Sequence, residues 1–223
     1  MSDFEWHCDE IVAQADLFAD HLNGVDTRAE SPPPDTALRD LSAVTDEDPE
    51  EVGTALRAAA VDLAGTLRQT GPTAQMWCPV PGGGSAFLAR RFAHETAIHR
   101  ADAALALGID FVLPSVVAAD GVEEWLDLGC MPFHFEVHPW MRDLLGPGRT
   151  IGLHGTDTGD AWLLDFTGDA IAWRRGAEHP AAELRGPVTD VLLMLYRRLP
   201  VTAVEIGGDA AMVDFWMERV AFS

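Results

Sequence analysis

The run from Ser85 to Leu107 contains neither proline nor glycine, and this constrains the fold more than any other stretch of the chain. An uninterrupted run of this kind predicts one long helix. One face of that helix carries a row of residues spaced by four, three, four and three positions: Leu88, Phe92, Glu95, His99 and Asp102. The row begins apolar and then continues with three titratable side chains on the same face. Burying an unpaired charge costs several kcal/mol, so in a buried row these groups should be paired, hydrogen-bonded or bound to a metal.

The order of the expected elements predicts two domains. Apolar residues at helical spacing predict three further helices before residue 130, at 5–23, 45–69 and 115–128. From Thr150 the pattern changes to short strands separated by turns, at 150–154, 161–166, 170–174, 182–185 and 201–206. Helices are expected between and after the last strands, at 188–198 and 209–220. The sequence therefore predicts a helical domain over residues 1–145 and a small α+β domain over 149–223.

The stretch Phe133–His138 alternates apolar and polar residues, which is typical of a strand. His134, Glu136 and His138 would then share one side, and two histidines on one side could bind a metal ion. The flanking prolines and the Gly146-Pro147-Gly148 sequence instead favour a surface linker.

Composition excludes several classes of protein. The net charge is −21 and the chain has 15 Lys and Arg residues, which argues against a generic nucleic-acid binder. The longest apolar runs, such as Val191–Tyr196, are too short to span a bilayer. The start Met1–His7 lacks the features of an export signal, so we expect a cytoplasmic protein. Three cysteines far apart favour neither a disulfide framework nor a CxxC zinc site.

The row on the long helix suits metal binding at one pair of positions. His94 and His99 are five residues apart, a rotation of about 140° on a helix, so they do not converge on one ion. Glu95 and His99, at positions i and i+4, can meet one divalent cation if other ligands come from another helix. A buried Glu–His hydrogen bond explains the same spacing equally well. Asp102 could orient His99 as an outer partner or face solvent.

Two segments resemble one known family. Residues 91–103, RFAHETAIHRADA, resemble the signature of the mycothiol-dependent maleylpyruvate isomerase family, within the DinB-like group of metal-binding four-helix bundles. Residues 185–198, RGPVTDVLLMLYRR, together with Gly208-Asp209 and the last helix, resemble the smaller C-terminal domain of that family. The resemblance implies a DinB-like helical bundle followed by a small α+β domain.

The resemblance also implies an activity. A divalent metal, usually zinc, would be held by three protein ligands, with Glu95 and His99 as two of them. The thiol of mycothiol would bind at the metal and add to a small unsaturated acid, as in the conversion of maleylpyruvate to fumarylpyruvate. Arg198 lies where the C-terminal arginine of the family falls and would hold substrate carboxylates, although a solvated arginine at a helix end explains it as well. The expected partners are a small-molecule substrate and a thiol.

One part of the family pattern is absent. The family has a turn and a second helix after its first helix, and a histidine on that second helix is the third metal ligand. Here Asp26 is followed directly by Thr27 and then by Pro32-Pro33-Pro34, with no such helix. Either the protein has lost this segment, or the sequence omits it. His21 or His7 could replace that ligand only if the first helix shifted. Two hypotheses follow: a thiol-dependent metalloenzyme, or a metal-poor relative that acts as a binding or structural protein.

Overall fold

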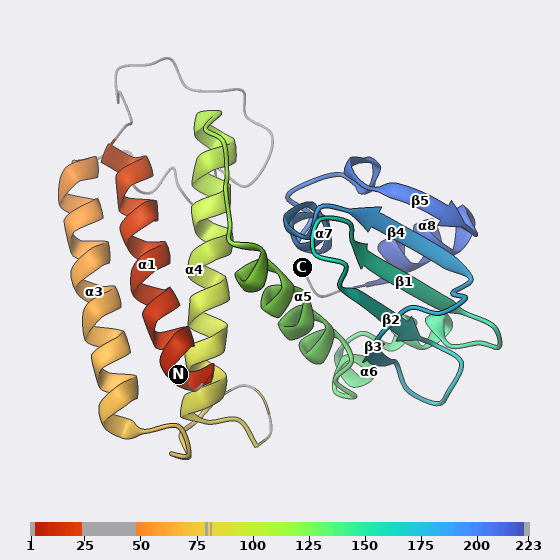
Figure 1. Ribbon diagram of the computed structural model, residues 1–223. Helices are drawn as coiled ribbons and strands as arrows, with labels where there is room; N and C mark the ends of the chain where they lie inside the picture. Colours follow the sequence, from red (N-terminus) through yellow and green to blue (C-terminus); the bar gives the residue numbers. More distant parts are fainter. Residues whose placement is uncertain (1–2, 24–47, 79, 81, 221–223) are drawn as a thin grey trace. The chain divides into compact units, whose positions relative to one another are not determined.

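The computed structural model describes residues 3–23, 48–78, 80 and 82–220, and the chain divides into two compact units, Met1–Val112 and Leu113–Ser223 (Figure 1). The predicted order, a helical region followed by an α+β domain, is confirmed. The junction between Asp26 and Thr27, the loop through the three prolines and the predicted start of the second helix at residue 45 lie outside the described residues. Within the described ranges, no helix combines the length and apolar character needed to cross a membrane.

In the described part of the first unit there are three long helices, and α1 packs against both of the others (Figure 1). They are α1 (Asp3–Asn23), α3 (Pro49–Thr70) and α4 (Ser85–Leu107). The start of α3 is capped, because the Asp48 side chain accepts a hydrogen bond from the backbone N–H of Glu50, and Pro49 lies in the first turn, where its missing N–H costs nothing. The long helix predicted from the absence of proline and glycine is α4, with the predicted bounds.

Small side chains on α4 make its packing against α1 close. The buried residues of α4 include a run of alanines at spacings of four, four, four and three: Ala89, Ala93, Ala97, Ala101 and Ala104. Ala89 and Ala93 join a core cluster with larger side chains of the other helices, among them Phe4, Cys8, Ile11 and Leu67. The face of α4 that enters the core is therefore the alanine face.

Two arginines of α3 that are eleven residues apart, Arg57 and Arg68, form ion pairs with carboxylates of α1. Arg68 contacts Glu5 at 3.0 Å and Asp9 at 2.5 Å. Arg57 contacts Asp16 at 3.4 Å and also pairs with Asp20. Eleven residues are about three helical turns, so equivalent contacts recur on the same sides of the two antiparallel helices and fix their register.

The second unit contains a five-stranded mixed sheet with the order β3-β2-β1-β4-β5. Its strands are β1 (Thr150–Gly155), β2 (Ala161–Asp165), β3 (Ala172–Arg175), β4 (Ala182–Gly186) and β5 (Glu205–Gly208). Only β1 and β4 pair in parallel among these strands. The helical elements are α5 (Ser115–Gly129), α6 (His134–Val137), η2 (Pro139–Leu144), α7 (Val188–Leu195), η3 (Val201–Ala203) and α8 (Ala210–Arg219).

The helix α5 belongs to this second unit because tryptophans of the sheet bind its acidic residues. Trp162 of β2 donates its indole N–H to Glu123 at 2.9 Å, and Trp173 of β3 donates to Asp127 at 3.0 Å. The boundary between the two compact units therefore follows Val112 in the sequence. The sequence pattern had placed the change of domain between residues 145 and 149. Hydrophobic periodicity alone identified α5 as a helix but carried no information about its packing partner.

Two local expectations are wrong. Residues 133–138 were expected to be extended or a linker, but His134–Val137 is a helical turn followed by the 3-10 helix Pro139–Leu144. The strand expected over 201–206 is displaced, because Val201–Ala203 forms a 3-10 turn and β5 begins at Glu205. In both places a helical turn next to a proline interrupts a pattern of alternating side chains.

Candidate functional site

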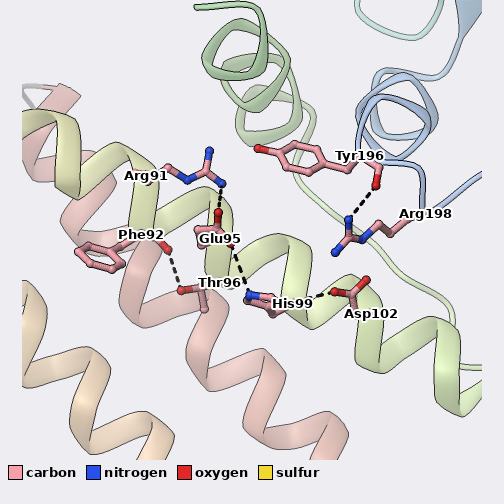
Figure 2. A network of polar contacts seen from close by, with 8 residues as sticks. All are labelled: Arg91, Phe92, Glu95, Thr96, His99, Asp102, Tyr196 and Arg198. Carbon is pink, nitrogen blue, oxygen red and sulfur yellow. Dashed lines mark hydrogen bonds and ion pairs between the residues drawn. The ribbon is translucent and has the colours of Figure 1, made fainter. Parts of the chain in front are cut away.

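The polar row of α4 is connected by ion pairs along the helix (Figure 2). Nη2 of Arg91 lies 2.6 Å from Oε1 of Glu95. Oε2 of the same carboxylate lies 3.4 Å from Nε2 of His99, whose Nδ1 lies 3.4 Å from Oδ2 of Asp102. Both ring nitrogens of His99 thus face carboxylates, one turn before and one turn after it. The predicted juxtaposition of Glu95, His99 and Asp102 on one face is present.

The row is at the surface of the helix and not in its core. The side chains of Glu95 and His99 are 45% and 59% exposed, while those of Arg91 and Asp102 are 14% and 13% exposed. Phe92, one of the two apolar residues with which the row begins, is 37% exposed. The expectation of a buried row is therefore wrong, because the alanines take the core position on α4. Glu95 and His99 are accessible to an ion or a small molecule from solvent.

A third ligand for this pair is not found among the described residues. Within the described ranges, neither Glu95 nor His99 belongs to a group of three candidate metal ligands. Residues 24–47, which lie outside the described ranges, contain no histidine or cysteine. A histidine ligand of the kind that the family pattern requires cannot come from that segment.

His7 and His94 form a second, buried arrangement between α1 and α4. They are 6% and 1% exposed, and their rings meet edge to face with centroids 6.1 Å apart. Trp6 packs beside His7 with a centroid distance of 4.9 Å. The sequence signal for the burial of His7 was its position four residues before Ile11, on the core face of α1.

The side chain of Arg100, adjacent to His99, points into the interior of the first unit, and the residue is 2% exposed. Its Nε donates to Oε1 of Gln14 at 2.9 Å, its Nη2 donates to the carbonyl of Val112 at 2.8 Å, and its guanidinium lies 4.3 Å from the ring centroid of Phe111. Burial lowers the pKa of Arg100 to about 10, which leaves it charged at neutral pH. This cation joins α4 to α1 and to the chain segment after α4.

His21, the other substitute considered for a third ligand, lies near the same arginine. Burial lowers the pKa of His21, the charge of Arg100 lowers it further, and a hydrogen bond with the Arg100 backbone opposes the change. His21 is therefore associated with Arg100, which faces the core, and not with the exposed Glu95–His99 pair.

Arg198 lies in the second unit, in the turn after α7. Its Nη1 donates to the carbonyl of Tyr196 at 2.7 Å (Figure 2), and its backbone N–H donates to the carbonyl of Leu193 at 2.8 Å. The neighbouring Arg197 has the left-handed backbone angle φ = 59° and donates to the carbonyls of Met217, near the end of α8, and of Val220, just after it. Arg197 therefore links the turn after α7 to the end of α8, and Arg198 beside it is partly buried.

Two family models match the chain, one in each unit. Residues 7–104 match the mycothiol maleylpyruvate isomerase N-terminal domain, and residues 116–215 match the MDMPI C-terminal domain. The first match includes most of α1 and almost all of α4 with the whole polar row, and the second runs from α5 into α8. No curated protein sequence matches the chain at a significant level.

Proposed function

This chain belongs to the mycothiol maleylpyruvate isomerase family, and we propose that it is a divalent-metal-dependent and thiol-dependent enzyme of the isomerase or transferase type. The observation that carries the proposal is the exposed pair Glu95 and His99, whose facing atoms are 3.4 Å apart within the matched N-terminal domain. A carboxylate oxygen and an imidazole nitrogen are both ligands that zinc accepts.

The residues of α4 fit the first two positions of such a site. Glu95 and His99 would hold the ion, and Asp102 would accept the Nδ1 hydrogen of His99 and so keep its Nε2 directed to the ion. Arg91 holds Glu95 in place through the opposite carboxylate oxygen. A bound divalent metal would lower the pKa of a coordinated thiol, such as that of mycothiol, so that the thiolate is present at neutral pH.

The proposed substrate is a small unsaturated acid or another electrophile. The planar guanidinium of Arg198 would bind its carboxylate, since that geometry allows two parallel hydrogen bonds. A chain with a net charge of −21 repels anions at long range, so a local cation is needed for such a substrate.

A second pair of candidate ligands is supported by a different observation. His7 and His94, both in the first unit, are almost fully buried and lie edge to face, and imidazole nitrogen is a ligand that zinc accepts. An ion held by Glu95 and His99 would be more accessible to a thiol than one held by this buried pair.

Metal analysis of the untagged protein tests the proposal. We expect one equivalent of divalent metal at neutral pH, which Glu95→Ala and His99→Ala lose and Glu51→Ala, an exposed carboxylate of α3, retains. Thiol-dependent turnover of maleylpyruvate or of a model electrophile should disappear in the same two variants.

Two other outcomes have clear meanings. If His94→Ala loses the metal while Glu95→Ala and His99→Ala keep it, the buried pair is the metal site and the exposed pair is not. If the wild-type protein binds no stoichiometric metal and shows no thiol-dependent activity, the enzyme proposal fails in favour of a metal-poor relative with a binding or structural role.

A further inference from the structure

The helix α7 ends in a tight turn that leads directly into Arg198. The backbone N–H of Arg197 donates to the carbonyl of Met194 at 2.9 Å. The backbone N–H of Arg198 donates to the carbonyl of Leu193 at 2.8 Å. These two hydrogen bonds form a Schellman motif, in which the residue before the last donor has a left-handed backbone. Arg197 has that backbone, with φ = 59°, so the position of Arg198 depends on the conformation of Arg197.

Arginine is an unusual residue at this place in the motif. Glycine is usual there, because it lacks the Cβ that makes a left-handed backbone unfavourable. The structure shows contacts that oppose this cost: Nη2 of Arg197 donates to the carbonyls of Met217 at 2.8 Å and Val220 at 2.9 Å. The helix dipole also favours a cation at these carbonyls, which lie at the end of α8. The side chain of Arg197 therefore ties the turn after α7 to the end of α8.

The two helix ends joined by this tether are packed in the core of the second unit. Every residue of Val191–Tyr196, which runs up to the turn, is buried. At the end of α8, Trp216 and Val220 are buried too, and Trp216 packs edge to face on Trp125 of α5 with centroids 6.0 Å apart. The carbonyls that accept from Arg197 thus belong to a well-packed part of the unit, and the tether transmits their fixed position to the turn.

The turn also determines where the guanidinium of Arg198 lies. Its Nη1 donates to the carbonyl of Tyr196 at 2.7 Å (Figure 2), so the backbone and the side chain of Arg198 are both bonded to the last residues of α7 and the turn. A guanidinium binds a carboxylate through two parallel hydrogen bonds, which require a set orientation. If the turn opened, Arg198 would lose that orientation, and binding would have to supply the cost of restoring it.

We propose that Arg197 is a positioning residue for the substrate: its tether to α8 keeps the turn closed and so holds the guanidinium of Arg198 ready to bind a carboxylate. The inference rests on the proposed function, in which Arg198 is the cation that binds the substrate carboxylate. It does not depend on the metal ligands, because both arginines and the helix ends that they contact belong to the second unit. Arg197 itself acts only through Arg198.

Titration of the full, untagged chain with maleate, a small unsaturated dicarboxylate, tests the inference without turnover. Calorimetry gives the affinity, and ¹H–¹⁵N spectra report the Nε–H signal of Arg198. Arg197→Gly removes the tether, while glycine still allows the left-handed backbone that the helix end needs. We expect this variant to bind maleate about 10-fold more weakly, the cost of immobilising one long side chain, and to show a shifted Arg198 signal before maleate is added.

Two further variants separate positioning from charge and from folding. Arg197→Lys keeps a cation that can donate to the same carbonyls, so it should restore much of the affinity that Arg197→Gly loses. Arg219→Ala removes one positive charge from the last turn of α8, where Arg219 contacts Phe215 and Glu218 of the same helix. This variant should bind maleate nearly as the parent protein does.

The result for Arg198→Ala shows which statement fails if the expectation is wrong. If Arg198→Ala loses maleate binding while Arg197→Gly keeps the affinity of the parent, the positioning role is wrong and the role of Arg198 stands. If Arg197→Gly binds weakly but leaves the Arg198 signal unchanged, Arg197 contacts maleate directly and is not a positioning residue. If the parent does not bind maleate, or Arg198→Ala binds it equally well, the proposed role of Arg198 fails and the inference fails with it.

Discussion

Two neighbouring residues of α4 face opposite environments. His94 is 1% exposed and packs against His7, whereas the side chain of Glu95 is 45% exposed and faces His99. A second pair of neighbours further along α4 shows the same contrast: the side chain of His99 is 59% exposed, whereas Arg100 is 2% exposed. Successive residues of a helix are rotated by about 100°, so one short sequence can serve two faces. The segment with the family signature therefore combines packing residues and candidate ligands.

The largest expected difference between the two faces is in stability. Arg100→Ala and His94→Ala should each lower the free energy of unfolding by about 2–4 kcal/mol, because they leave a cavity or unpaired buried groups. Glu95→Ala and His99→Ala should each stay within about 1 kcal/mol, since exposed ion pairs contribute little. Urea denaturation of the four variants measures this. Equal losses of unfolding free energy in all four variants would contradict the division of α4 into a buried and an exposed face.

A smaller effect concerns the ligand face alone. Asp102→Asn should weaken metal binding at the Glu95–His99 pair by about 10–100-fold, because it removes the carboxylate that orients His99. Stability of the metal-free protein should change little. Competition with a chelating dye gives the affinity, and Asp62→Asn, at an exposed carboxylate of α3, is the matched control. Unchanged affinity would show that Asp102 has no orienting role.

The pH dependence of stability tests the core side. The pKa of His21 is lowered in the folded state by burial and by Arg100, so the unfolded state takes up protons first as the pH falls through about 6.5. Stability from this group is present above that pH and is lost below it. His21→Gln should therefore reduce the slope of unfolding free energy between pH 7.5 and 5.5 by at most about 1.4 kcal/mol per pH unit. A slope that His21→Gln leaves unchanged would argue against burial of this ring.

The smallest effects are expected for the exposed ion pairs between α1 and α3. Arg57→Ala and Arg68→Ala should each cost about 0.2–1 kcal/mol at low salt, because their partners are half exposed. The difference from wild type should shrink in high salt, where such pairs are screened. Thermal unfolding at two salt concentrations measures it. A larger loss that salt does not reduce would mean that these arginines act through packing.

Much of the fold follows from local patterns. The absence of proline and glycine from 85 to 107 was sufficient to predict α4, and apolar residues at helical spacing predicted the body of α3. Alternation and turn residues identified the first four strands. The patterns failed where a chain segment packs on a remote partner: α5 binds the tryptophans of the sheet, and residues 133–138 form a helical turn despite their alternation.

The candidate site was predictable in part. The i, i+4 spacing placed Glu95 beside His99, and Asp102 beside His99 on the next turn, because helix geometry depends on sequence separation alone. The burial of His7 against His94 was not predictable in this way. Those two residues are on different helices, and their proximity depends on how α1 packs against α4.

The sequence by itself determined the helices, the main strands and which side chains share one face of α4. The tertiary structure decided which face is buried. The alanines allow a close approach to α1, so they take the core, and the polar row of Glu95, His99 and Asp102 is left toward solvent. Periodicity defines a face of a helix, but only packing against a partner decides what that face meets.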